Sequence, residues 1–511
     1  MLRWVFAVAV ASTILACGSR SRLLEPGSGA GAGGLGGGGL GGGGTGSGGT
    51  VGGGAGGLAG SGGVGGSLTC AYSDVVLGGN HTCALDSSGA VLCFGSNQFG
   101  QLGNGKPGKS ATTPQPVAGP GDFVALGAGE YHSSGIRGSG DILGWGHNPL
   151  GVLGDGTTVD QAVPSAAKGP GAAVAISQGM IASHACAVHA NGSATCWGTD
   201  SHGSLGTGDL EPSLVPKPVI GLQDAVAVTV GYIFSCAVEG SGAVKCWGWN
   251  ASGALGIGNL DGKSYPKPVS VIGISNAVQV VAGNHYACAR TSSGAVSCWG
   301  YNGHGQLGIG SNVEQSPLAK PVVGINDAIW ISAGQSHACA VRVGGTVSCW
   351  GRNYYGQLGD GTTVESNAPV TVLGVVDATR VSAGGEHTCV INKSQGLVCW
   401  GANSSGQLGN GSSESSKVPV KTGCPLSTCG GVDESLIKAH FLPCPDGKHL
   451  GQVAPAAGVT CAEVCCVFGF AGCSQRAAQS SFDPCLPAKP AKSGSCADVF
   501  QDQWSSQCAC E

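Results

Sequence analysis

The sequence predicts an all-β protein: a seven-bladed β-propeller with four-stranded blades, followed by a small disulfide-rich C-terminal module. Three observations predict this fold class. A phrase of the form Cys-Trp-Gly-x-Asn-x-x-Gly-x-Leu-Gly-x-Gly recurs in seven copies between residues 70 and 420. Each copy holds short apolar stretches separated by Gly- and Ser-rich turns, and helix signals are nearly absent. Because one such unit cannot cover its own apolar faces, seven units of this length are expected to stack and close into a ring.

The copies are evenly spaced. The residue before the recurring aromatic serves as a marker, and the markers are Cys93, Gly144, Cys196, Cys246, Cys298, Cys349 and Cys399, which are 50–52 residues apart. In each copy an alternating apolar stretch leads to a strand, a tight Ser/Gly turn and a second strand that ends at the phrase. This pattern is typical of antiparallel hairpins.

Six copies carry a second cysteine ten positions before the marker. The second copy has Ser134 and Gly144 at these places, so both cysteines are lost together, as expected of a bonded pair. Strands joined by a tight turn bring such positions opposite each other, within disulfide reach. The predicted disulfides are Cys83–Cys93, Cys186–Cys196, Cys236–Cys246, Cys288–Cys298, Cys339–Cys349 and Cys389–Cys399.

Three features together resemble the regulator of chromosome condensation repeat. They are the Gly-Gln-Leu-Gly-x-Gly phrase, as at residues 305–310, the Trp-Gly-x-Asn phrase, and a His just upstream of a Cys-Ala pair, as at His81, His184 and His337. The resemblance covers about 350 residues and implies a seven-bladed propeller. The founding member of the family promotes nucleotide exchange on a small nuclear GTPase and binds chromatin. The uniform spacing leaves no room for the projecting insertion used there, so no small GTPase is expected as a partner.

The N-terminus predicts export and lipid attachment. Residues 1–16 combine Arg3 with a short apolar run, as in a signal peptide. Ile14-Leu15-Ala16-Cys17 resembles a bacterial lipobox, so Cys17 is the predicted lipidation site; a plain signal peptide is the alternative. Residues 17–66 then form a Gly-rich linker without a packed core. The predicted location is the outer membrane or the cell surface, with the lipid as the contact to the membrane.

The propeller is predicted to span residues 67–423. The first copy lacks a preceding Pro-Val strand, whereas Val418-Pro419-Val420 follows the seventh. We therefore expect this last segment to complete the first blade and seal the ring. Cys70 and Cys424 stand at the two ends of the propeller, and a Cys70–Cys424 disulfide is the predicted cross-link of that seam, with a near neighbour such as Cys429 as the alternative partner of Cys70.

Residues 424–511 form the predicted C-terminal module, which contains eleven cysteines. This density in an exported segment indicates a disulfide scaffold. Zinc binding by these cysteines, with His440 and His449, is a less favoured alternative. The module is a candidate binding head.

Composition and motifs exclude several functions. The 511 residues include 97 Gly and 25 Cys, with a net charge of −5 and 24 thinly spread basic residues. Such a chain has no basic patch for nucleic acid. No nucleophile elbow, Walker loop or zinc-protease phrase occurs, so we predict no enzyme activity, no metal site and no cofactor. Histidines that recur from copy to copy are expected to hydrogen-bond a neighbouring backbone group; they are His81, His132, His184, His337 and His387.

A binding face is expected where the copies differ, because the blade does not dictate those residues. The residue after Trp-Gly and the residue two before the Gln-Leu-Gly phrase vary most clearly. Tyr, Trp and Arg are enriched at binding hot spots. The candidate binding residues are Trp249, Tyr301, His304, Arg352, Tyr354 and Tyr355.

The leading functional prediction is non-catalytic binding of a protein or glycan outside the cytoplasm. Some propellers of this family bind proteins through the ring of loops on one face, among them a secreted bacterial inhibitor of β-lactamases. The alternatives are a structural envelope component without a specific ligand, and an extracellular enzyme with a site in the propeller funnel or the C-terminal module.

Overall fold

The computed structural model describes residues 71–179, 184–222, 224–393 and 396–423, and the backbone of four short strands between residues 441 and 510. The signal peptide, Cys17, the linker, the Cys70–Cys424 pair and His440 lie outside the described residues. So does the disulfide connectivity of the C-terminal module.

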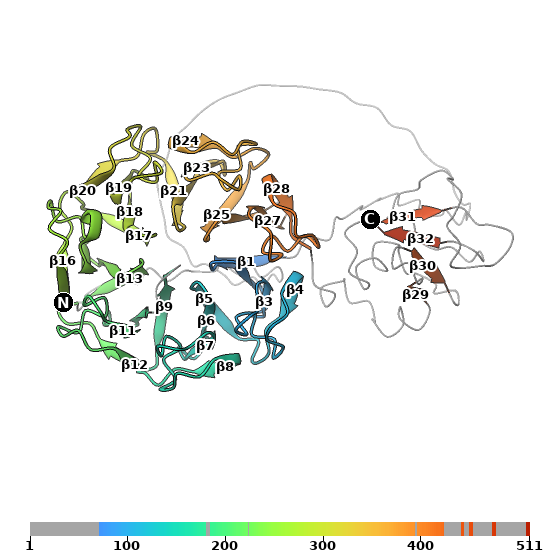
Figure 1. Cartoon of the computed structure of the whole chain (residues 1–511), viewed down its shortest axis with the longest axis horizontal. Helices are drawn as coiled ribbons and strands as arrows, with labels where there is room; N and C mark the ends of the chain where they lie inside the picture. The colour runs from blue at the N-terminus through green and yellow to red at the C-terminus, as the bar shows by residue number, and fades with distance from the viewer. Residues whose placement is uncertain are drawn as a thin grey trace, which may run out of the picture. The chain divides into compact units, whose positions relative to one another are not determined.

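Seven four-stranded antiparallel sheets form a closed ring around a central axis, which confirms the predicted fold class (Figure 1). Each blade is one continuous stretch of chain. Blade 1 holds β1 to β4, and the following blades each take the next four strands, up to β25 to β28 in blade 7.

The first strand of every blade lies next to the axis and the fourth lies at the rim (Figure 1). The first strands are β1 (Tyr72–Leu77), β5 (Phe123–Ala128), β9 (Ala173–Gln178), β13 (Ala225–Val230), β17 (Ala277–Ala282), β21 (Ala328–Ala333) and β25 (Ala378–Ala383). The second strands are β2 (His81–Asp86), β6 (His132–Arg137), β10 (His184–His189), β14 (Phe234–Glu239), β18 (Tyr286–Thr291), β22 (His337–Arg342) and β26 (His387–Asn392).

The third strands carry the Cys-Trp-Gly phrase. They are β3 (Val91–Gly95), β7 (Ile142–Gly146), β11 (Ala194–Gly198), β15 (Val244–Trp249), β19 (Val296–Tyr301), β23 (Val347–Gly351) and β27 (Gly396–Gly401). The fourth strands are β4 (Ala111–Pro116), β8 (Gln161–Ala166), β12 (Ser213–Pro218), β16 (Ser264–Ser270), β20 (Gln315–Pro321), β24 (Ser366–Thr371) and β28 (Ser416–Lys421). One short 3₁₀ turn, η1 (Ala251–Gly253), lies in the loop of blade 4.

Proline recurs in the fourth strands because these are edge strands, where a missing N–H need not break a ladder. The structure contains all six blade disulfides. Each joins the second and third strands at directly opposed residues, with Cα atoms 4.0–4.1 Å apart. In blade 2 the same register pairs Ser134 with Gly144.

The core lies between neighbouring blades. Each recurring Trp is at most 1% exposed, and its Nε1 donates to a backbone carbonyl in the loop of the preceding blade, as from Trp350 to Gln306 at 2.9 Å. The Gly of the Leu-Gly phrase permits this contact. Gly308 has φ +67°, and a Cβ there would come within 2.7 Å of the Trp350 ring. The residues of the repeat phrase therefore hold neighbouring blades together.

The predicted completion of the first blade by residues 418–420 is wrong. That segment belongs to β28, which pairs with β27 of its own blade, for example Val420 with Cys399. Blade 1 takes its fourth strand, β4, from the chain that follows β3. The Pro-containing strand follows the Trp-Gly phrase, or Phe94-Gly95 in the first copy, so blade 1 has its own in Thr113-Pro114-Gln115-Pro116.

The first and last blades are instead joined as neighbours. Gly385 N donates to Gly78 O at 3.2 Å and Gly411 N donates to Thr112 O at 2.9 Å. Leu77 and Phe94 of blade 1 share a buried cluster with Cys399 of blade 7. Side-chain packing and main-chain hydrogen bonds close the ring.

In the C-terminal module, the described strands form one four-stranded sheet in the order β29 (Phe441–Pro443), β30 (His449–Gln452), β32 (Gln507–Cys510) and β31 (Cys473–Arg476).

Candidate functional site: the loop face of the propeller

One end of the propeller carries both the turns between the first and second strands and the long loops between the third and fourth strands. We call this end the loop face. The candidate binding residues lie in or at the start of these segments, since Trp249 and Tyr301 end β15 and β19, and the loops that follow hold the others. The opposite end carries only short turns and the crossings between blades.

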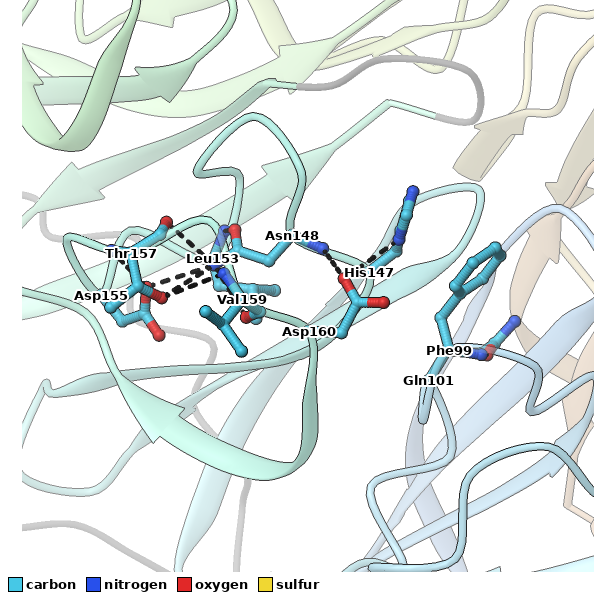
Figure 2. Close-up of polar contacts among 9 residues, drawn as sticks. All are labelled: Phe99, Gln101, His147, Asn148, Leu153, Asp155, Thr157, Val159 and Asp160. Atoms are coloured by element: carbon cyan, nitrogen blue, oxygen red, sulfur yellow. Dashed lines mark hydrogen bonds and ion pairs between the residues drawn. The ribbon is translucent and has the colours of Figure 1, made fainter.

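A buried Asn organises each long loop. Figure 2 shows Asn148 in blade 2: its Oδ1 accepts from Leu153 N at 3.0 Å, and its Nδ2 donates to Thr157 O at 3.1 Å and Val159 O at 3.2 Å. Equivalent bonds are made by Asn302 in blade 5, with distances of 2.7–3.1 Å. The Trp-Gly-x-Asn phrase thus fixes the loop backbone, and the side chains between these fixed points are free to vary.

Blade 3 departs from this rule because Asp200 replaces the Asn. Its Oδ1 still accepts from Leu205 N at 2.8 Å. Burial is the largest influence on this carboxyl and raises its pKa to about 6. A carboxylate cannot donate to the loop carbonyls as the Asn amide does.

The recurring histidines belong to the blade framework. Four of the five donate from Nε2 to a Ser or Thr hydroxyl of the next blade, rather than to the backbone group that we expected, whereas Nε2 of His132 has no partner. The pairs are His81–Ser133, His184–Ser235, His337–Thr388 and His387–Thr82, at 2.8–2.9 Å. The hydroxyl in turn donates to the loop carbonyl that also accepts from the recurring Trp, as with Thr388 and Gln357 O.

This donation fixes the neutral Nε2–H tautomer of the imidazole, because the hydroxyl proton is already used. Nδ1 of His81, His337 and His387 is buried without a hydrogen-bond partner. Burial lowers the pKa of His337 to about 3 and that of His81 to about 4. Such imidazoles stay neutral and buried, so they are framework residues and not site residues.

Trp249 lies in an aromatic cluster at the junction of blades 3, 4 and 5. Its ring centroid is 5.0 Å from His202 and 5.6 Å from His285, and His285 packs edge-on against Tyr232 at 5.2 Å. Trp249 Nε1 donates to Gly262 O at 2.9 Å. This bond holds the indole in place on the loop face.

Tyr301 and His304 line an open polar hollow of about 550 Å³ between the loops of blades 5 and 6. His304 Nδ1 lies 2.9 Å from Glu365 Oε1 across the hollow. Asn367 Nδ2 donates to Asn312 Oδ1 at 2.6 Å and ties the same two loops together. The hollow is lined by Tyr301, Asn302, Gly303, His304, Gly305, Asn312, Glu314, Glu365, Ser366 and Asn367.

Arg352 pairs with Glu386 of blade 7 at 2.8 Å. Burial raises the pKa of the Glu386 carboxyl, and Arg352 opposes that rise. Tyr354 and Tyr355 pack edge-on at 4.8 Å and are 66% and 38% exposed. The six candidate residues therefore fall into three groups along the loop face: Trp249, the hollow, and the blade 6 group.

The sequence interpretation missed a further cluster between blades 1 and 2. Phe99 packs against His147, with ring centroids 4.0 Å apart (Figure 2). Phe99 also packs against Tyr131 at 5.3 Å. Asp160 Oδ1 accepts from Asn148 N at 2.7 Å and lies 3.1 Å from His147 Nδ1.

A third variable position in the repeat could have revealed this cluster from the sequence. It directly precedes the second strand of each blade and holds Tyr131 in blade 2, His285 in blade 5 and Glu386 in blade 7. Each of these contacts a residue that follows a Trp-Gly phrase. A comparison of the seven copies at this position would have found them.

Among the residues that the structure describes, no group of three or more His, Cys, Asp or Glu side chains is arranged to hold a metal ion. The same part of the chain contains no helix with the length and apolar character of a membrane span.

The chain is therefore a repeat propeller with a constant buried framework and a variable loop face. Residues 88–136, 191–238, 241–290, 293–341 and 344–391 match the Regulator of chromosome condensation (RCC1) repeat. The ultraviolet-B receptor UVR8 of Arabidopsis thaliana is 30% identical over 304 residues, which cover 58% of this chain and 68% of UVR8. The chain belongs to the RCC1-repeat family, and the resemblance seen in the sequence is confirmed.

Other matches are more limited. The human E3 ubiquitin-protein ligase HERC2 is 28% identical over 292 residues, but the chain spans only 5% of HERC2. Among solved structures, human WBSCR16 has a TM-score of 0.60 at 19% identity and covers 66% of this chain and 94% of its own. Yeast RCC1 (Prp20) has a TM-score of 0.59 at 17% identity, with coverage of 70% and 86%. These two structures share the fold.

Proposed function

We propose that the protein is an exported, surface-tethered and non-catalytic binding protein whose loop face takes a protein ligand outside the cytoplasm. One observation carries the proposal. The residues that differ between otherwise matching copies gather on the loop face as aromatic and charged groups, as at Trp249 and the hollow. Aromatic residues and Arg on a rigid scaffold are typical of binding hot spots.

The direction of the chain supports this choice of face. β1 runs toward the loop face, since the turn of residues 78–80 follows it, so the chain enters the propeller at the opposite end. β28 follows the loop of residues 402–415 and ends at that same opposite end. The described propeller therefore begins at residue 71 and ends at residue 423 on the end opposite the loop face.

A crosslinking pull-down from intact cells tests the proposal. The bait is the full chain, and parallel baits carry Trp249→Ala with Tyr355→Ala or lack residues 424–511. We expect the double variant to lose the captured ligand and the shortened bait to keep it. Capture that survives in the double variant and disappears with the C-terminal module would move the binding site to that module. The absence of any saturable ligand would favour a structural envelope role.

A further inference from the structure

The loop face carries an excess of negative charge. Its turns and long loops hold twelve acidic and four basic residues, whereas the turns and crossings at the opposite end hold five and two. The acidic residues of the loop face are Glu130, Asp155, Asp160, Asp200, Asp209, Glu211, Asp261, Glu314, Asp360, Glu365, Glu386 and Glu414. The basic residues are Lys106, Lys109, Lys263 and Arg352. Ten of the twelve acidic residues are at least partly exposed, and Asp155 and Asp200 are buried. A surface with this excess of negative charge attracts cationic partners and repels anionic ones.

Aromatic rings are interleaved with these acids. Tyr301 lines the hollow together with Glu314 and Glu365, and Trp249 and Tyr355 lie on loops that also hold acidic residues or neighbour such loops. A guanidinium or ammonium group gains from a ring face and from a carboxylate at the same time. The combination therefore favours Arg or Lys side chains over neutral groups.

The hollow between blades 5 and 6, of about 550 Å³, has room for one such side chain. Glu365 and Glu314 both line it, together with the Tyr301 ring. Both Glu side chains belong to exposed residues, and within the described residues the Glu314 carboxylate makes no hydrogen bond or ion pair. A cation in the hollow would find one free carboxylate and a second that it shares with His304.

A hydrogen-bond donor without a partner, Gln306 Nε2, lies near the hollow. Gln306 is fully buried; its Oε1 accepts from His304 N at 2.9 Å, and its Nε2 has no partner. In blade 1 the equivalent nitrogen, of Gln101, donates to Ser96 Oγ, and Tyr301 occupies the place of Ser96 in blade 5. By analogy with blade 1, this buried Nε2 faces Tyr301 and stays unpaired beneath the hollow. The guanidinium of Arg can stack on a ring and pair with a carboxylate through two donors at once, which the ammonium groups of a polyamine cannot do.

We propose that the loop face binds a basic, Lys- or Arg-rich protein segment and that one cationic side chain enters the hollow between Glu314 and Glu365. This inference rests on the proposed function and names the chemistry of its ligand.

The test measures the binding of a fluorescein-labelled nonapeptide of arginine to the full chain by anisotropy at several salt concentrations. A nonapeptide of glutamate and spermine are the comparison probes. The loop-face variant is Glu314→Gln with Glu365→Gln. The matched control is Asp141→Asn with Asp224→Asn, which removes two exposed carboxylates from the opposite end. Unchanged melting temperatures establish that both variants fold.

We expect the arginine peptide to bind in preference to both comparison probes, with affinity that falls as salt rises. The loop-face variant should weaken binding by about tenfold, and the control by less than about twofold. Equal weakening in both variants would reduce the result to general electrostatics and overturn the proposal. Preference for spermine or for the glutamate peptide would also overturn it. If the pull-down ligand still depends on Trp249 and Tyr355 while the arginine peptide fails to bind, only this inference falls and the proposed function stands.

Discussion

His337 and Thr388 lie 2.9 Å apart, Nε2 to Oγ1, across the boundary between blades 6 and 7. Both residues are fully buried. Four of the seven blade boundaries described by the structure contain an equivalent pair of His and Ser or Thr. Each pair forms a buried hydrogen bond that joins two neighbouring blades across an otherwise apolar interface.

Removing the hydroxyl should destabilise the propeller. Thr388→Val keeps the shape but leaves His337 Nε2–H buried without an acceptor, which costs about 1–3 kcal/mol. The free energy of unfolding in urea measures this loss. Thr363→Val, at an exposed loop residue, is the control and should change stability by less than about 0.5 kcal/mol. Equal effects of the two substitutions would contradict a stabilising role for the His337–Thr388 hydrogen bond.

Adding a missing hydroxyl should stabilise the propeller. His132 is buried and its Nε2 has no partner, because Ala185 stands where the next blade would supply Ser or Thr. Ala185→Ser should raise the free energy of unfolding by about 1 kcal/mol. Ala287→Ser is the matched control, since Phe234 replaces the His there and the new hydroxyl faces a ring. A gain in the control equal to that of Ala185→Ser would disprove the pairing.

Acid should weaken the propeller through its histidines. The pKa is lowered to about 4 in His81 and to about 3 in His132, His184, His337 and His387, in each case chiefly by burial. The unfolded chain therefore takes up protons first. Stability is complete above the unfolded pKa near 6.5 and is lost as pH falls from there toward 4, by about 1.4 kcal/mol per pH unit for each histidine.

Urea unfolding from pH 8 to pH 4.5 measures this slope. The double substitution His337→Phe with Thr388→Ala copies the Phe234–Ala287 pair of blades 4 and 5. It should reduce the slope by the contribution of one histidine. An unchanged slope would mean that other groups cause the acid lability.

Asp200 should make blade 3 weaker at neutral pH than in mild acid. Burial raises its pKa to about 6, so its contribution is complete below the unfolded pKa near 3.9 and is lost as pH rises through 6. Asp200→Asn supplies the amide that the other loops use and should raise the thermal midpoint at pH 7.5 more than at pH 5. Asn302→Asp is the reverse change and should lower it at pH 7.5. Shifts that do not depend on pH would refute this account.

The sequence by itself determined the propeller, its blade count and the six blade disulfides, because each follows from the spacing of residues within and between neighbouring repeats. A hairpin of fixed length sets which residues oppose each other, so a Cys ten positions before another predicts the bond directly. The framework residues were also visible, since Asn302 and Trp350 recur from copy to copy. The export signal, Cys17 and the Cys70–Cys424 cross-link remain predictions.

Only the tertiary structure decided what happens between blades. The closure of the ring was predicted wrongly, because the position of Val418-Pro419-Val420 in the repeat does not reveal which neighbouring strand it pairs with. The partner of His337 and the contacts of Tyr131, His147 and Glu386 likewise join residues of adjacent blades or separate loops. Such contacts depend on how one blade is rotated against the next, and that rotation is set by packing of the whole ring and not by any short stretch of chain.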